Sequence, residues 1–492
     1  MIAHLPALQV VIPLFAAPLC VLLRKGMLPW LITLAVSWVA LLIAGVQLAD
    51  VLDGGPVSYA LGGFAAPFGI EYRVDVLNAF MMLIVAGMAA VILPFARKSV
   101  AAEIREDQHF LFYAAFLLML TGLLGMAITG DAFNLFVFIE ISALSSYALI
   151  AMGKNRRALR AAFTYLVMGT AGATFILIGI GLLYVVTGTL NMADLAERLQ
   201  PVNESRTVLV AFAFLAVGIS LKLALFPLHM WLPNAYTYAP SVVTAFLAAT
   251  ATKVAIYVLL RFIFTIFGVE FSFGALPLGE ILLVLAITSI VIASTVAIFQ
   301  KNIKRMLAYS SLAQIGYIIL GISYANVTGL SAAIMHLFNH AATKGALFLI
   351  LGCVVYRTGS AHIDKLQGLG RRMPLTMFGF AIAGLSLIGV PLTAGFISKW
   401  YLVLGAMERG WWPAAVVVLS TSLLAVAYIW KVVEVAYFRP LPEDAGDLAD
   451  PPLSMLIPAW VLILSTIYFG IETSLPVGVA EQAARFLFEN SP

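Results

Sequence analysis

The amino-acid sequence predicts an all-α polytopic membrane protein of about fourteen transmembrane helices. Of its 492 residues, 62% are hydrophobic and only 11% are charged, whereas soluble domains have about 25% charged residues. The apolar residues form continuous runs of about 20, the length at which a helix crosses the hydrocarbon core of a bilayer. These runs lack the alternation of polar and apolar residues that marks a transmembrane β-barrel.

Apolar runs of this length follow one another along the whole chain. The predicted spans are Leu5–Leu23, Pro29–Ala49, Val76–Phe95, Phe110–Ile128, Ala132–Met152, Phe163–Thr187, Val208–Phe226, Val242–Ile266, Ile281–Phe299, Met306–Ser323, Leu330–Tyr356, Met377–Val403, Ala414–Phe438 and Ser454–Phe469. Between the second and third spans, Asp50–Arg73 is rich in Gly and Pro, which predicts an external hairpin or loop. The amphipathic residues Val479–Glu489 predict a helix lying on the membrane.

Basic residues gather in alternate loops, as the positive-inside rule requires of cytoplasmic loops. This pattern needs an even number of spans and predicts a bacterial inner-membrane protein with both termini outside. The last inside loop, Arg439–Pro452, is instead acidic and rich in Pro, which predicts a flexible or partner-facing segment. The basic loop residues are Arg24, Lys25, Arg97, Lys98, Lys154, Arg156, Arg157, Arg160, Lys301, Lys304, Arg305, Arg357, Lys365, Arg371 and Arg372.

The sequence carries no signal of a soluble catalytic domain. It has no Gly-rich nucleotide loop, no Walker motif and no cysteine cluster, and its two cysteines, Cys20 and Cys353, have no metal-site spacing. We therefore expect no cofactor, no metal and no nucleic-acid partner. Any redox or ATP chemistry would have to come from partner subunits.

Lys222 lies near the end of an apolar helix that Pro227 interrupts, with Pro233 and Pro240 further on. A charge at membrane depth costs about 2.5–3.5 kcal/mol and needs a partner, a water cavity or a function. A helix break frees backbone groups, which are tolerated only where protein or water lines a cavity. The combination predicts an ion path; the alternative is a lysine that extends to the membrane interface.

A second interrupted span, Val390–Trp400, again combines Pro, Gly and a lysine, Lys399. Interrupted spans at corresponding positions of two halves point to a transport site. We therefore expect broken helices in spans seven and twelve, and two units of five spans, the second inverted relative to the first. The predicted segments are residues 1–108, the first unit 109–266, the second unit 276–438, and a C-terminal part 439–492.

Glu140 is a carboxylate within the fifth span. Alone in an apolar environment it would stay protonated, whereas a nearby ammonium favours its charged form. Lys222 is the natural partner, and the pair would switch when the lysine moves away. The alternative is a static buried ion pair, which adds little to stability.

Further ionisable residues lie in later spans. Lys253 has Thr250 and Tyr257 at i−3 and i+4, where their hydroxyls could orient water beside the amine; the small residues around it could instead serve tight helix packing. His336, His340 and Lys344 share one helix face at a spacing of four. Histidine titrates near neutral pH and carries protons readily; the alternative for either histidine is a satisfied core residue.

Three other residues are weaker candidates. Lys431 and Glu434, spaced i and i+3, could pair near the cytoplasmic end of the thirteenth span, and His229 follows the break at Pro227, where it could act as a gate. A substrate site would concentrate charged groups in one place. A row from Glu140 to Lys399 instead predicts lateral proton transfer at mid-membrane depth.

This row and its sequence context resemble the antiporter-like membrane subunits shared by respiratory complex I, membrane-bound hydrogenases and Mrp-type sodium/proton antiporters. The resemblance covers about residues 75–437. The stretches that carry it are Phe138–Glu140 with Ser145–Tyr147, Leu221–Pro233 with Ala239–Ser241, Asn302–Tyr317, His340–Lys344 and Gly389–Lys399.

The resemblance implies a proton relay made by Glu140, Lys222, Lys253, His336, His340, Lys344 and Lys399. Within the family, the length and the stretch Gly130–Glu140 look most like the D-type component of Mrp antiporters. That implies a hetero-oligomeric assembly, exchange of protons against sodium, and contact with lipid. The alternatives are a proton-pumping subunit of complex I or a hydrogenase, and a scaffold subunit without flux of its own.

Overall fold

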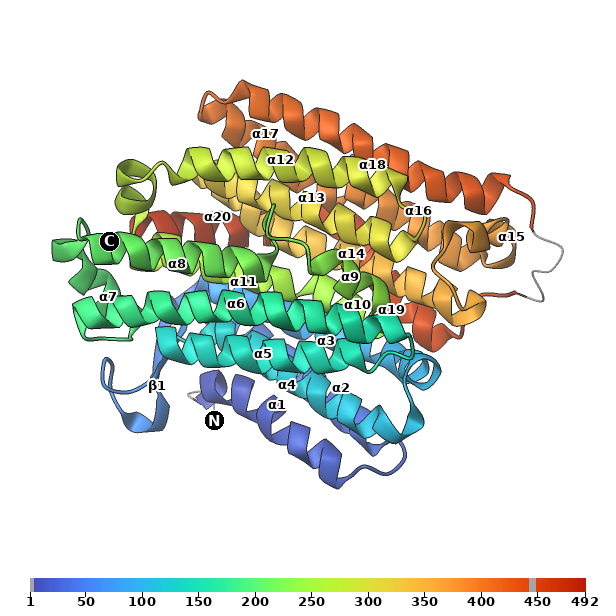
Figure 1. Ribbon diagram of the computed structural model, residues 1–492, viewed down its shortest axis with the longest axis horizontal. Coiled ribbons are helices and arrows are strands. Elements are labelled where there is room, and N and C mark those ends of the chain that lie inside the picture. The colour runs from blue at the N-terminus through green and yellow to red at the C-terminus, as the bar shows by residue number, and fades with distance from the viewer. Residues whose placement is uncertain (1–3, 442–447) are drawn as a thin grey trace.

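The computed structural model describes residues 4–441 and 448–492 as one bundle of long helices (Figure 1). The chain begins with α1 (Leu5–Leu22) and α2 (Leu28–Gly54). The predicted hairpin is confirmed, whereas its external position stays a prediction: β1 (Val57–Ala60) pairs antiparallel with β2 (Glu71–Val74), and Val57 faces Val74 in the register. Residues 442–447 of the predicted acidic loop lie outside the described residues.

The helices that follow the hairpin contain the first predicted unit. They are α3 (Val76–Glu103), α4 (His109–Ile128), α5 (Ala132–Ala151), α6 (Arg156–Thr187), the short α7 (Met192–Leu199), α8 (Arg206–Leu223), α9 (Leu232–Tyr238), α10 (Ser241–Ala249) and α11 (Ala251–Leu260). Two π-helical stretches, Arg261–Ile266 and Glu270–Ala275, connect this part to the next.

The remaining helices contain the second predicted unit and the C-terminal part. They are α12 (Leu278–Phe299), α13 (Ile303–Ser323), α14 (Val327–Thr358), α15 (Leu369–Arg372), α16 (Pro374–Ile388), α17 (Ala394–Glu408), α18 (Trp412–Phe438), α19 (Leu453–Ile471) and α20 (Ser474–Glu489). The division into two inverted units stays a prediction.

The prediction of an all-helical membrane bundle is confirmed. Thirteen stretches of helix in the described ranges are long and apolar enough to cross a membrane. A further span is divided into α16 and α17, so the described chain matches the expected number of about fourteen. The start of α1 and the end of α20 lie toward the same end of the bundle, as an even number of spans requires (Figure 1).

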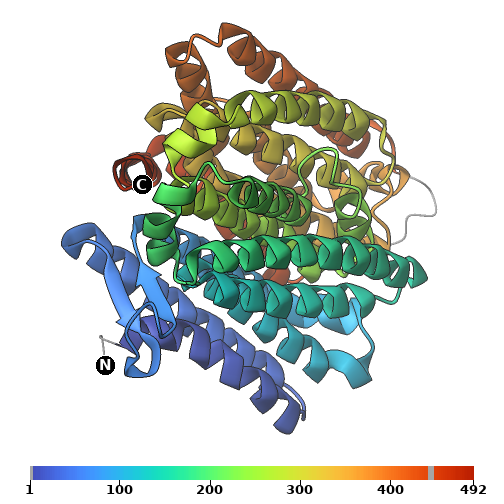
Figure 2. The ribbon, with the colours of Figure 1, turned by 60° about the vertical axis from the view of Figure 1, so that its left-hand side comes forward.

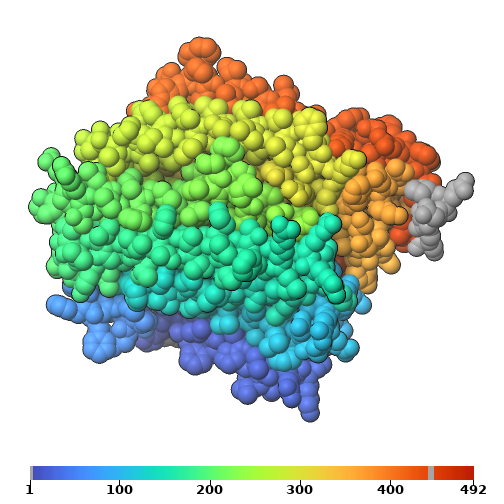
Figure 3. All heavy atoms as spheres, in the orientation of Figure 1, coloured from blue at the N-terminus to red at the C-terminus, as the bar shows by residue number. Residues whose placement is uncertain are grey.

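The helices form a broad bundle with α14 at its centre. In two views, α1 and α2 lie at one edge and α17 and α18 at the opposite edge (Figures 1 and 2). On the face shown in Figure 3, the green residues of α8 lie between the teal residues of α6 and the yellow residues of α12. Helix α14 packs against α10 and α3 on one side and against α13, α16 and α17 on the other. It therefore connects the two predicted units.

Two predictions about boundaries and surroundings were wrong. Helix α8 ends at Leu223, before the predicted Phe226, because Pro227 has no amide hydrogen and restricts the residue before it. Lys304, counted as a loop residue, is buried and donates to the Ala239 carbonyl at 3.0 Å. The predicted amphipathic helix is present as α20, which buries its apolar face against α3 and α14, and its position on the membrane stays a prediction.

Candidate functional site

The Lys222 ammonium lies 3.4 Å from the Glu140 carboxylate, so the structure brings together the two residues that the sequence paired. Glu140 comes from α5 and Lys222 from the last turn of α8. The negative end of a helix dipole favours a cation at this position. The Lys222 side chain is 10% exposed and that of Glu140 is 26% exposed. This end of the row therefore reaches the surface of the chain.

The helix break beside Lys222 is built by residues on both sides of Pro227. Ala224 has a left-handed backbone, with φ +61°, and ends α8. The indole of Trp231 then donates to the Leu221 carbonyl at 2.9 Å, which satisfies one backbone group that the break sets free. Trp231 is itself held by stacking on Tyr165, with ring centroids 3.9 Å apart.

His229, the candidate gate, lies within this break. Its ring stacks on Phe226 with centroids 5.1 Å apart. The buried Nδ1 atom of His229 has no hydrogen-bond partner among the described residues. The structure therefore places His229 close to the broken helix, without a contact to the other residues of the row.

A cavity of about 40 Å³ separates Lys222 from the helix that carries Lys253. Its lining includes Lys222, Ser142 and Tyr165 on one side and Ala251 and Ala255 of α11 on the other. Most of the lining is apolar, but Lys222, Ser142 and Tyr165 offer polar groups, and a space of this size has room for about two water molecules. The cavity is therefore suited to a water link between Lys222 and the helix of Lys253.

Lys253 is fully buried at a break in the eighth span that the sequence did not reveal. Helix α10 ends at Ala249 and α11 begins at Ala251, with Thr250 in a non-helical conformation between them. The ammonium of Lys253 donates to the Ala248 carbonyl and lies 3.5 Å from the Thr252 hydroxyl.

The hydroxyls of Thr250 and Tyr257, which were expected to lie beside the Lys253 amine, donate to backbone carbonyls instead, and this corrects that prediction. Thr250 donates to the Phe246 carbonyl at 2.7 Å, the usual backbone bond of a helical threonine. Tyr257 donates to the Ala127 carbonyl at 2.7 Å. Thr252, which follows the break directly, takes the place beside the amine.

His336, His340 and Lys344 form one buried stripe on α14. The His336 ring is held at both nitrogens, by Ser398 at 2.8 Å and by Gln314 at 2.9 Å. It stacks on His340 at a centroid distance of 6.0 Å. Lys253 lies close enough for its charge to act on His336, His340 and Lys344.

His340 has no hydrogen-bond partner at either ring nitrogen in the described part of the chain, although it is only 2% exposed. Buried polar atoms nearly always have a partner, from protein or from ordered water. Two unpaired nitrogens in the middle of the stripe therefore indicate a position for water between Lys253 and α14.

Lys399 lies at the break between α16 and α17. Its ammonium donates to the carbonyls of Leu387 and Ile388, at 3.2 and 2.8 Å, and to the Ser422 hydroxyl at 3.1 Å. The break requires a glycine: a Cβ at Gly395 would lie 1.9 Å from the Ser386 carbonyl oxygen. Lys253 and Lys399 therefore both bind carbonyls that a helix break has set free.

Side chains that the sequence analysis did not select contact Lys344 of the stripe and Lys399. Lys344 donates to Ser310 at 2.8 Å, and Ser310 bonds to Tyr428 at 2.9 Å. The Lys399 ammonium lies 4.9 Å from the Tyr317 ring centroid. In the sequence, these residues stand out only as polar residues within apolar spans. Such residues are too common to identify a contact.

Lys431 and Glu434 do not form the pair that their spacing suggested. Lys431 donates to the carbonyls of Ile298 and Gln300 at the end of α12, at 3.0 and 3.1 Å. Glu434 pairs instead with Arg439 at 3.2 Å. The end of α12 offers Lys431 unpaired carbonyls, which compete successfully with an exposed carboxylate.

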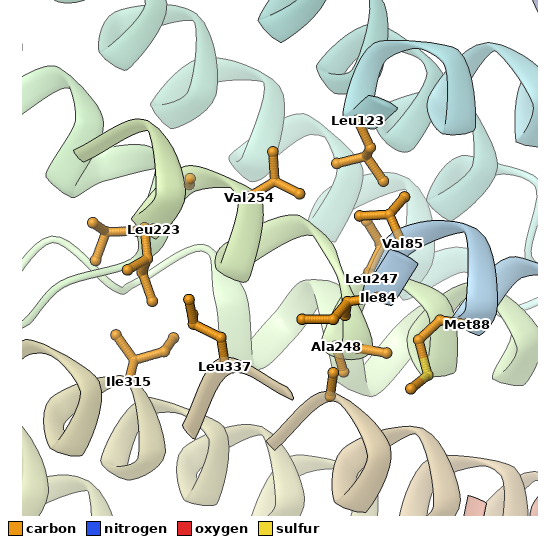
Figure 4. Close-up of a cluster of buried hydrophobic side chains, with 14 of the residues drawn as sticks. Ile84, Val85, Met88, Leu123, Leu223, Leu247, Ala248, Val254, Ile315 and Leu337 are labelled. Carbon is orange, nitrogen blue, oxygen red and sulfur yellow. The ribbon is translucent and has the colours of Figure 1, made fainter. Parts of the chain in front are cut away.

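Apolar side chains surround the row of ionisable residues from Glu140 to Lys399. Figure 4 shows a cluster to which α3, α10, α11 and α14 contribute, among them Ile84, Ala248, Val254 and Leu337. Ala248 and Val254 flank the break that holds Lys253. Apolar regions exclude charged species, so the ionisable groups of the row are set apart from their apolar surroundings.

Comparison with known proteins identifies several relatives. The family model described as "NADH:quinone oxidoreductase/Mrp antiporter, TM" matches residues 129–425. The chain is 43% identical to the N-type component of the NADH-quinone oxidoreductase of Desulforudis audaxviator, over 96% of each chain. It is 29% identical to the D-type component of the Na(+)/H(+) antiporter of Bacillus subtilis, over 98% of this chain and 96% of that one.

Solved structures resemble the chain over nearly its whole length. A chain of the Mrp complex from Dietzia matches with a TM-score of 0.90 at 27% identity, covering 99% of this chain and 98% of that one. A chain of the archaeal membrane-bound sulfane sulfur reductase also gives 0.90, at 32% identity and the same coverage. Respiratory complex I from Thermus thermophilus gives 0.77 at 26% identity, covering 98% and 100%.

Proposed function

Because the chain belongs to the NADH:quinone oxidoreductase/Mrp antiporter membrane family, we propose that it is the proton-translocating membrane subunit of a multisubunit complex. Protons move along Glu140, Lys222, Lys253, the α14 stripe and Lys399. The observation that carries the proposal is the Glu140–Lys222 pair at a broken helix. The 40 Å³ cavity joins it to the helix of Lys253.

The Glu140–Lys222 pair acts as the switch of this relay. At 3.4 Å the ammonium stabilises the charged carboxylate. When Lys222 swings toward the cavity beside α11, Glu140 loses its partner and takes a proton. The movement needs only the Lys222 side chain, which lines this cavity.

Two assemblies fit the relatives, and both need partner subunits. The Bacillus and Dietzia relatives favour a monovalent cation/proton antiporter, in which protons exchange against sodium. The relative from Desulforudis favours an NADH-quinone oxidoreductase, driven by electron transfer elsewhere. Purification of the tagged chain with its native partners separates the two: antiporter subunits support the first, and iron–sulfur or flavin proteins support the second.

The proposal also includes an orientation of the chain in the membrane. We place the chain in a bacterial inner membrane with the basic loops inside and both termini outside, on the charge pattern of the loops. The residue ranges 109–266 and 276–438 are the two inverted units. The correspondence between the lysines at the two broken helices, Lys222 and Lys399, supports this division.

Transport by Glu140→Gln in vesicles that contain the whole complex tests the relay. Glutamine keeps the shape but cannot take up a proton, so proton transport is expected to stop while the complex still assembles. Lys222→Ala is expected to stop transport as well. Full transport in either variant contradicts the relay, and loss of assembled complex with unchanged transport per complex indicates a packing pair.

A further inference from the structure

A second cavity, of about 320 Å³, opens at the end of the bundle that carries the β hairpin, α7 and α20. Its lining includes Glu71, Asp75, Glu197, Tyr257, Arg261 and Asn490. This is the end opposite to α15 and the basic loops (Figure 1). Neither Arg261 nor Asp75 belongs to the relay described above.

An ion pair closes the base of this cavity. One terminal nitrogen of Arg261 lies 2.6 Å from both carboxylate oxygens of Asp75, and the two side chains are 7% and 2% exposed. Asp75 is fixed independently, because it caps α3 and accepts from the amides of Leu77 and Asn78. The guanidinium is therefore held at one place.

Arg261 lies on the helical segment that carries Lys253, two turns further toward the cavity, or about 12 Å along the axis. Between them is Tyr257, which accepts from the Arg261 Nε at 2.9 Å and lies under its guanidinium. A π-helical stretch begins at Arg261, a distortion that occurs often at functional sites.

We propose that Arg261, held by Asp75, is the barrier that keeps protons in the cavity from reaching Lys253. An arginine cannot release its proton at ordinary pH, so it cannot pass one on as lysine and histidine do. A fixed positive charge in a narrow path also repels protons and other cations. This inference rests on the proposed function, since a barrier matters only where a relay lies behind it.

Replacement of both charges together tests the barrier without leaving a buried charge unpaired. The variant combines Asp75→Asn with Arg261→Gln; asparagine keeps the helix cap, and the neutral pair can still hydrogen-bond. In vesicles containing the whole complex, with a pH gradient imposed and no driving reaction, passive proton leak per assembled subunit is expected to rise at least about tenfold. Arg261→Lys keeps the positive charge but can release its proton, so its passive proton leak should lie between those of the wild type and the double variant.

Glu197→Gln is the matched control, because Glu197 lines the same cavity at an exposed position and should leave the leak unchanged. A double variant whose passive proton leak equals that of the wild type contradicts the proposal. Failure of this proposal can be distinguished from failure of the relay. Glu140→Gln changes proton transport that a reaction drives, whereas the double variant changes passive proton leak without a driving reaction.

Cysteine labelling with Arg261 in place gives a second test, independent of whether the double variant assembles. Ala193→Cys lies in the cavity wall, and Ala127→Cys lies at a fully buried position of α4 whose carbonyl accepts from Tyr257. Both native cysteines are buried. A small water-soluble thiol reagent should modify position 193 and spare position 127; equal rates at the two positions contradict the barrier.

Discussion

The ammonium of Lys253 binds the carbonyl oxygen of Ala248, at the point where the eighth span breaks. The amide of Thr250 donates to Phe246 and the amide of Lys253 to Thr250, so the regular helical pattern shifts here. A backbone carbonyl in a membrane needs a partner, and the ammonium supplies it. Proton release by Lys253 would weaken this bond, which couples the charge of the relay to the shape of the helix.

The hydroxyl of Thr252 is expected to matter more than that of Thr250. Thr252 lies 3.5 Å from the Lys253 ammonium, whereas Thr250 bonds to its own helix. Loss of one hydrogen bond of about 1 kcal/mol corresponds to about a fivefold slower rate. Proton transport per assembled complex should therefore fall about fivefold in Thr252→Val and stay near wild type in Thr250→Val. The reverse order would contradict this assignment.

His340→Phe should separate stability from function. The buried nitrogens of His340 have no partner among the described protein residues, so phenylalanine breaks no hydrogen bond within the protein and should leave thermal stability near the wild-type value. Loss of a group that transfers protons costs about a hundredfold in rate. Thermal unfolding and proton transport of the same preparation check both parts. A stable variant with normal transport would remove His340 from the relay.

The break before α17 should tolerate no side chain at position 395. In Gly395→Ala the new Cβ would lie 1.9 Å from a backbone oxygen, an overlap that costs about 1–3 kcal/mol or more. The amount of subunit in the membrane should fall sharply. Gly181→Ala is the control: no atom lies within 4 Å of its added Cβ, and alanine favours a helix. Equal amounts of the two variants would contradict this account of the break.

The sequence predicted the features that local chemistry determines. Apolar runs predicted the spans, the Gly-rich stretch before Arg73 predicted the hairpin, and the prolines beside Lys222 predicted a broken helix. The pairing of Glu140 with Lys222 was also predicted, because a buried carboxylate and a buried ammonium have few other partners.

Features that depend on contacts between distant segments were not predictable from the sequence. The break at Thr250 has no proline or glycine nearby and depends on the Lys253 ammonium. Asp75 and Arg261 are separated by 186 positions in the chain, so no local pattern joins them. Lys431 looked like a partner of Glu434 because helical spacing does not reveal the free carbonyls of a neighbouring helix.

Proton flux through complexes that carry Lys253→Gln tests the central claim most directly. Glutamine can still donate to the Ala248 carbonyl, so the helix break and the assembly should survive, but it cannot take up or release a proton. Lys301→Gln, in an exposed loop, is the control. The relay predicts that flux per assembled complex falls at least about a hundredfold in Lys253→Gln and is unchanged in the control. Flux near the wild-type value in Lys253→Gln would contradict a relay through this residue.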